Sequence, residues 1–231
     1  MYFGGYYWVV IGPSVNALPE PAFELTGGAL CLDFANSVDN RPTLRAQDLL
    51  PDYRHLLAWS LQVGALSETE VAELVSRADQ VPAESARALE RSRQVREAIF
   101  SVFSAAARAE RPPRDDVKVL NEAIRQAFGR LELEPAADGY RWHWQSQPPD
   151  LDRPLWPIVR SAADLLTSTD LARVRECNAE NCGWLFLDKS KNRARRWCDM
   201  KVCGNRSKAR RYRAAREAAR AGAASSSRPS S

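Results

Sequence analysis

Four cysteines near the C-terminal end of the chain have the spacing of a metal site. They follow the pattern C-x4-C-x15-C-x4-C and are Cys177, Cys182, Cys198 and Cys203. Structural Zn²⁺ is held by four tetrahedral ligands, and two close cysteine pairs joined by a crossing segment supply them. The spacing therefore predicts one structural Zn²⁺, with two disulfides or free buried thiols as the alternatives. Cys31 lies far away in the sequence, and we expect it to be free and buried.

The most basic segment of the chain surrounds the second cysteine pair. Residues 188–220 contain 13 Lys and Arg against 3 Asp and Glu. After Gly204 the residues are mainly Ala, Arg and Lys, which predicts a helix ending at Gly222. At about 100° per residue, five arginines fall on roughly one third of its circumference. They are Arg206, Arg210, Arg213, Arg216 and Arg220. The segment between the cysteine pairs adds Lys191, Arg193, Arg195 and Arg196.

An arginine stripe beside a metal knuckle predicts a rigid surface for a phosphate backbone. The alternative is a solvated cationic helix with no partner. Asn205 and Arg206 stand where the helix begins, which suits the DNA major groove, where Asn pairs with adenine and Arg with guanine. They would serve equally to cap the helix and hold a phosphate. RNA is the alternative partner, with Tyr212 and Trp197 as stacking aromatics.

The remaining chain predicts a mainly α fold with two β-hairpins. Leu and aromatic residues at helical spacing predict helices over 45–63, 84–109, 114–129 and 155–168. Ser67 and Glu70 fit a capping box that opens another short helix. One hairpin is predicted over 23–34, around Gly27-Gly28, and a second over 131–145. The cysteine segment adds a zinc knuckle, a short strand and the basic helix.

Charge divides the chain into two parts. Residues 1–170 carry a net charge of −7, whereas residues 171–231 carry +11. We expect a helical domain over 20–170 and a finger over 171–220, flanked by a disordered extension over 1–19 and a disordered tail over 221–231. The sequence contains neither a membrane-length apolar run nor a recognisable secretory signal, which predicts a cytoplasmic protein.

The helical domain offers polar residues among apolar ones as a candidate ligand pocket. Its candidate residues are Asp33, Asn36, Arg41, Tyr53 and Trp59. Buried polar groups beside aromatics orient small ligands. The alternative is that they cap helices and satisfy backbone groups. Phosphate loops, dinucleotide fingerprints and nucleophile elbows are missing from the sequence, so we expect no enzyme.

The C-terminal segment closely resembles the CGNR zinc finger, whose tetrapeptide stands here as Cys203-Gly204-Asn205-Arg206. The stretch WLFLDKSKNRARRWCDMKVCGNRSKARRYR resembles that family's pattern almost throughout. FELTGGALCLDFANSVDNR and SAADLLTSTDLARVREC resemble the start and end of the ABATE domain, a stress-induced transcription regulator. The resemblance covers about residues 20–215 and leaves MYFGGYYWVVIG outside.

The resemblance implies a bacterial regulator with an N-terminal sensor-like domain and a DNA-binding finger. A ligand-sensing or dimerising role for the helical domain follows, with a small-molecule effector as partner. A single basic helix contacts few base pairs, so specific DNA binding predicts a homodimer. A zinc-dependent RNA-binding or ribosome-associated protein is the alternative.

Overall fold

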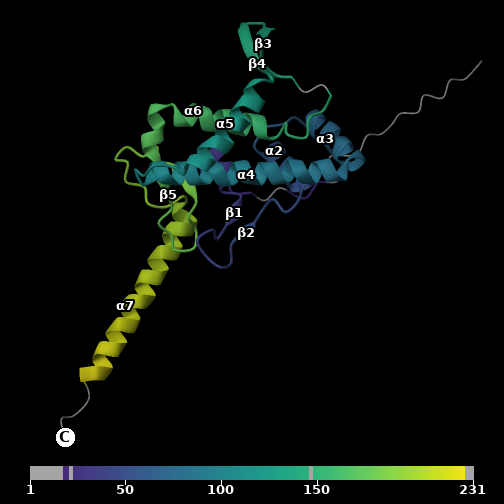
Figure 1. The fold of residues 1–231 in the computed structure, drawn as a ribbon. Coiled ribbons are helices and arrows are strands. Elements are labelled where there is room, and N and C mark those ends of the chain that lie inside the picture. The colour runs from purple at the N-terminus through teal and green to yellow at the C-terminus, as the bar shows by residue number, and fades with distance from the viewer. Residues whose placement is uncertain (1–17, 21–22, 146–147, 227–231) are drawn as a thin grey trace, which may run out of the picture.

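The computed structural model describes residues 18–20, 23–145 and 148–226. Most of the predicted N-terminal extension and residues 227–231 of the predicted tail lie outside these ranges. The helices are α1 Leu30–Ala35, α2 Tyr53–Gln62, α3 Glu68–Gln80, α4 Pro82–Ala107, α5 Arg114–Phe128, α6 Leu155–Leu166 and α7 Asn205–Ser226. Helices α1 to α6 form a body from which α7 projects as a single long helix (Figure 1). The mainly α prediction is confirmed.

Three small antiparallel hairpins accompany the helices. They pair β1 Val38–Asp39 with β2 Gln47–Asp48, β3 Leu131–Ala136 with β4 Gly139–Trp144, and β5 Val174–Glu176 with β6 Leu185–Leu187. The β3–β4 hairpin confirms the prediction for 131–145 and projects from the side of the body opposite α7 (Figure 1). None of the helices in the described ranges is both long and apolar enough to span a membrane.

Local signals fix several helix ends. Ser67 Oγ accepts from the Glu70 N–H and the Glu70 side chain accepts from the Ser67 N–H, so the predicted capping box opens α3. Helix α2 begins only at Tyr53, because Pro51 interrupts the predicted 45–63 helix and Asp52 caps the new start by accepting from the His55 N–H.

The hairpin predicted over 23–34 is wrong. Its second half is helix α1, and four of that helix's six residues are buried. The hairpin was predicted from the short apolar runs around Gly27-Gly28, and a short apolar run inside the core forms a buried helix as readily as a strand. Gly28 does make a turn, with φ +77°, and Asp33 Oδ1 accepts from the Gly27 N–H at 2.7 Å to fix that turn against α1.

The core of the body forms where α1 is enclosed by α2, α4 and α6. Phe34 and Trp59 pack with ring centroids 5.3 Å apart. Cys31 is free and fully buried, as predicted. Desolvation by burial raises the pKa of its thiol to about 12, so this cysteine stays protonated and packs as a small apolar residue.

Candidate zinc centre and basic surface

The four predicted ligands converge on one point. Their Sγ atoms all lie within 4.8 Å of one another, and all four residues are buried: Cys177, Cys182, Cys198 and Cys203. The Sγ atoms of Cys182 and Cys203 each lie 3.6 Å from that of Cys198. Four sulfurs bound tetrahedrally at about 2.3 Å from Zn²⁺ would be about 3.8 Å apart. None of the four is in a disulfide, so the donor set fits one structural Zn²⁺ and the prediction is confirmed.

The electrostatics of the cluster favour a bound cation. Hydrogen bonds from Cys182 and Cys198 lower the pKa of Cys177. Desolvation by burial and the charge of Cys177 raise the pKa of Cys203. Four thiolates so close together need a divalent ion, which would hold them deprotonated when it binds. Four protein ligands leave no open position for a water, so the centre is structural.

The first cysteine pair sits on a tight knuckle that touches the body. The Cys177 N–H donates to the Trp184 carbonyl at 2.8 Å and closes the turn. Gly183 has φ +68°, a conformation that side chains rarely adopt. A Cβ at Gly183 would also lie 3.2 Å from Cδ of Pro42. Glycine therefore lets this knuckle approach the loop between β1 and β2.

The second pair leads directly into the basic helix. Asp199 Oδ1 accepts from the Val202 N–H at 2.7 Å and caps a π-helical turn, Met200–Gly204. The Asp199 carbonyl also accepts from the Gly204 N–H at 3.0 Å. Helix α7 starts at Asn205. The metal thus fixes the position of the helix through the turn that carries its fourth ligand.

The β5–β6 hairpin joins the finger to the body through its two faces. Leu185 and Leu187 belong to the core of the body, together with Val174. Trp184 and Phe186 instead pack around the cysteines. The alternation follows from the period of two in a strand. One short strand therefore contributes to two cores, and the finger is not a separately packed unit.

Hydrogen bonds lock this junction. The Asn36 side chain donates Nδ2–H to the Leu185 carbonyl and accepts from the Leu185 N–H, both at 2.8 Å. Trp184 Nε1–H donates to the Val38 carbonyl at 2.9 Å. These groups are buried, so each bond satisfies donors and acceptors that water cannot reach.

The loop between the cysteine pairs is ordered by Asp188, which is fully buried. Its carboxylate accepts from the Ser190 N–H at 2.9 Å and the Arg195 N–H at 3.0 Å. The Arg195 guanidinium donates to the carbonyls of Trp197 and Cys198. It also lies 4.6 Å from the centroid of the Phe186 ring. Arg195 was predicted as a nucleic-acid contact, and the structure gives it a bracing position in the finger.

The other predicted basic residues lie on the same loop and on α7. Lys191, Arg193 and Arg196 are exposed on the loop, with Arg196 5.6 Å from the Trp197 ring. Those exposed on α7 are Asn205, Arg206, Arg210, Arg213 and Arg216. Arg210 pairs with Glu180 of the first knuckle. Arg220 belongs to α7, and its side chain lies outside the described part. We call the exposed loop and α7 side chains the basic surface.

The five residues predicted as a ligand pocket make contacts within the fold. Tyr53 Oη donates to the Leu151 carbonyl at 2.8 Å. Trp59 packs inside the core, and Asn36 holds β6. Their buried polar groups thus serve the fold, which is the alternative that the sequence left open.

The two charged residues predicted for the ligand pocket, Arg41 and Asp33, also have partners within the fold. Arg41 donates to the Ala35 carbonyl at 3.0 Å, pairs with Glu97 and lies 4.0 Å from the Phe100 ring centroid. Asp33 holds the Gly27-Gly28 turn, and desolvation by burial raises its pKa to about 6. Neither side chain is directed at a shared binding site.

Sequence reasoning missed two aspartates that position the site. Asp188 and Asp199 each accept from backbone N–H groups two to seven residues further along the chain. An Asp side chain that accepts from the backbone N–H two residues further on is typical of such turns. The sequence Asp188-Lys189-Ser190 was the available signal.

Comparison with known families matches residues 28–169 to ABATE, described as "Putative stress-induced transcription regulator". Residues 173–216 match the CGNR zinc finger. No curated protein matches the chain. The ABATE match covers more than half of the sequence, and the CGNR match contains all four cysteines. The chain therefore belongs to the ABATE family and carries a C-terminal CGNR zinc finger.

Proposed function

We propose that this protein is a bacterial, cytoplasmic transcription regulator that binds DNA through the basic surface of its zinc finger. The observation that carries the proposal is that α7 begins two residues after the fourth zinc ligand and exposes arginines from Arg206 to Arg216. A helix fixed at one end and free along the rest is suited to lie along a phosphate backbone or in a groove.

Electrostatics give this surface its affinity. Each arginine that neutralises a phosphate releases condensed counterions, so binding weakens with salt. Asn205 and Arg206 lie in the first turn of α7, where they would meet base edges if that turn entered the major groove. Arg213 and Arg216 lie further along and would contact phosphates.

RNA is the second candidate partner, and one residue favours it. Tyr212 is 64% exposed on α7, between arginines. Exposed aromatics stack on unpaired bases, which is how many proteins read single-stranded RNA. The same basic surface would then hold the RNA backbone.

The body would regulate the finger, by sensing a ligand or by dimerising. Specific DNA sites are usually read by paired modules, so the proposal includes a homodimer. It includes no catalytic activity, because the zinc centre has four protein ligands and no position for a reacting water.

A binding selection tests the proposal. The zinc-loaded protein would be incubated with a pool of random duplex DNA and, in parallel, with a pool of random RNA at physiological salt. We expect an enriched DNA motif, which would also supply the operator. Enrichment of RNA alone would assign the second candidate. Binding without any enrichment would exclude sequence-specific regulation.

A further inference from the structure

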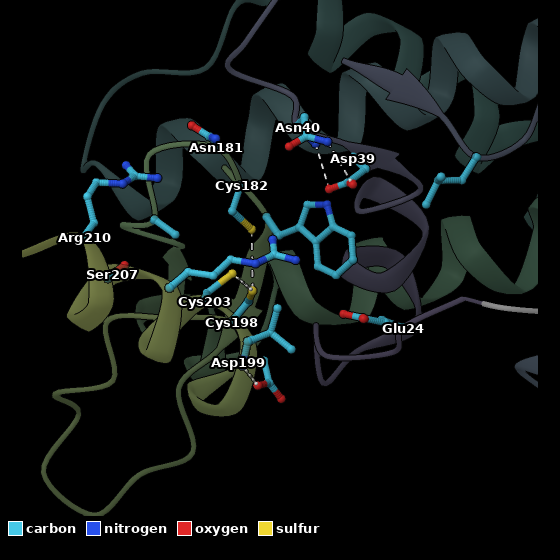
Figure 2. A pocket seen from close by; sticks show the side chains of 15 residues that line it. Glu24, Asp39, Asn40, Asn181, Cys182, Cys198, Asp199, Cys203, Ser207 and Arg210 are labelled. Atoms are coloured by element: carbon cyan, nitrogen blue, oxygen red, sulfur yellow. Dashed lines mark hydrogen bonds between the residues drawn. The ribbon is translucent and has the colours of Figure 1, made fainter. Parts of the chain in front are cut away.

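A cavity of about 270 Å³ lies between the body and the finger (Figure 2). The body contributes the β1–β2 hairpin and the segment before α1, and the finger contributes both knuckles and the start of α7. Its lining side chains include Glu24, Asp39, Trp184, Val202, Arg206 and Ser207, and also the zinc ligands Cys182, Cys198 and Cys203. Bound Zn²⁺ would take up part of this volume, and the whole is slightly below the range of about 300–1,000 Å³ typical of drug-sized ligands, so the cavity suits a smaller molecule.

Acidic and basic side chains both line the cavity, and Asp199 of the second knuckle is one of the acidic ones. Figure 2 shows Ser207 and Arg210 of α7 on one side, and Glu24 and Asp39 of the body on the other. Within the described ranges, neither Glu24 nor Arg206 has a hydrogen-bond or ion-pair partner. Both side chains line the same space without pairing with each other. A ligand with two charges would satisfy both.

The Asp39 carboxylate is held in place by hydrogen bonds from Asn40. Asp39 accepts from the Asn40 N–H at 2.8 Å and from Asn40 Nδ2–H at 3.0 Å. Asn40 has φ 51°, so the turn that holds this carboxylate is in the left-handed conformation. The Trp184 ring, Leu49 and Val202 also line the cavity. The Trp184 N–H is already bonded to the body, which leaves its carbon atoms to face the cavity.

We propose that this cavity binds a small zwitterion of the free amino-acid class. Its carboxylate would pair with the Arg206 guanidinium and the Ser207 hydroxyl, since Arg binds carboxylates through paired N–H donors. Its ammonium group would lie between the Glu24 and Asp39 carboxylates. An apolar side chain would pack against Trp184 and Val202.

Such a ligand would connect the body to the basic surface. One wall comes from the body and the other from α7, so binding favours the arrangement in which the two are held together. It also occupies Arg206, a candidate nucleic-acid contact, and would therefore weaken nucleic-acid binding. This last consequence rests on the proposed function, whereas ligand binding itself does not.

The test begins with thermal shift and calorimetry of the full zinc-loaded protein against each standard L-amino acid at about 10 mM, a concentration that detects millimolar affinities. The strongest binder is then compared with its decarboxylated amine and its deaminated acid. The variants are Glu24→Gln and Arg206→Gln, both at exposed positions that do not support the core. Arg111→Gln, also exposed and outside the cavity, is the matched control.

We expect at least one amino acid to bind, and each single-charge analogue to bind at least about tenfold more weakly, because a charge-assisted hydrogen bond is lost. Glu24→Gln and Arg206→Gln should each cause a similar loss, and Arg111→Gln none. Failure of every amino acid to bind would overturn the proposal, as would binding that both cavity variants leave unchanged. Ligand binding is measured without nucleic acid, so failure of the regulator proposal alone would leave ligand binding intact.

Discussion

At the scale of single residues, the cysteines and the arginines differ in how much their sequence positions reveal. The spacing of Cys177, Cys182, Cys198 and Cys203 predicts the zinc site, because four-coordinate geometry leaves few alternatives. An arginine has no such constraint. Arg195 has the same sequence context as its neighbours, yet it braces the carbonyls of Trp197 and Cys198. Only the folded loop distinguishes a bracing arginine from a free one.

Replacing one zinc ligand should unfold the finger. Cys182→Ser removes a thiolate from the centre, and we expect the variant to lose its zinc and the order of residues 177–215. Zinc per chain is measured by elemental analysis and order by hydrogen exchange. Cys31→Ala is the matched control, because Cys31 is buried in the body and should leave the zinc content unchanged. One zinc per chain in Cys182→Ser would contradict the ligand assignment.

At the scale of elements, sequence periodicity succeeded for α3 to α6 and failed where segments enter the core. Those helices are amphipathic or capped, so local signals suffice. The 23–34 segment is apolar on nearly every side in its second half, and periodicity does not separate a short buried helix from a strand. The attachment of β6 to the body could not be predicted either, since its hydrogen-bond partner Asn36 lies more than a hundred positions away in the sequence.

Helix α4 bonds to two hairpins, the β1–β2 hairpin and the β5–β6 hairpin. Its Arg96 side chain is only 4% exposed and donates to both carboxylate oxygens of Asp48 in β2, at 2.7 and 2.9 Å. Further along α4, Ser104 Oγ–H donates to Glu176 of β5 at 2.7 Å. The helix thus holds β2, beside the cavity, and β5, beside the zinc finger.

Asp48→Asn should destabilise the body in a pH-dependent way. Burial opposes ionisation of Asp48, but hydrogen bonds from Arg96 and the Leu50 N–H outweigh it and lower its pKa. The stabilisation is therefore present above the unfolded pKa of about 3.9 and is lost as pH falls through the lower folded value. At neutral pH we expect a loss of about 1–3 kcal/mol, since Asp48 is partly exposed.

Urea unfolding of the wild type and Asp48→Asn between about pH 3 and 7 measures this difference. Asp79→Asn, in the exposed pair of Asp79 with Arg54, is the control and should cost about 0.5 kcal/mol or less. A difference between wild type and Asp48→Asn that does not shrink toward acid pH would contradict the role of the Arg96 pair.

At the scale of the whole molecule, the body and the finger share their packing. Val174, Leu185 and Leu187 are finger-side residues in the core of the body. The sequence suggested two separate domains from its change in charge and its family patterns. Charge describes surfaces, however, and gives no information about cores that two segments build together. The shared core joins the finger directly to the body.

Helix α7 projects from this shared packing of body and finger (Figure 1). Helix α7 leaves the body on the side opposite the β3–β4 hairpin (Figure 1). The central claim is that zinc and the body hold this helix in position so that its arginines bind nucleic acid.

The most direct test of that claim is the salt dependence of duplex DNA binding, measured by fluorescence anisotropy for the wild type, Arg213→Gln and Arg216→Gln. Arg87→Gln, an exposed arginine of α4, is the control. We predict a steep negative slope of log K against log salt for the wild type and the control. Each α7 variant should reduce the slope by about one unit, because one phosphate contact is lost. Equal slopes in all four proteins, or no binding at low salt, would contradict the account.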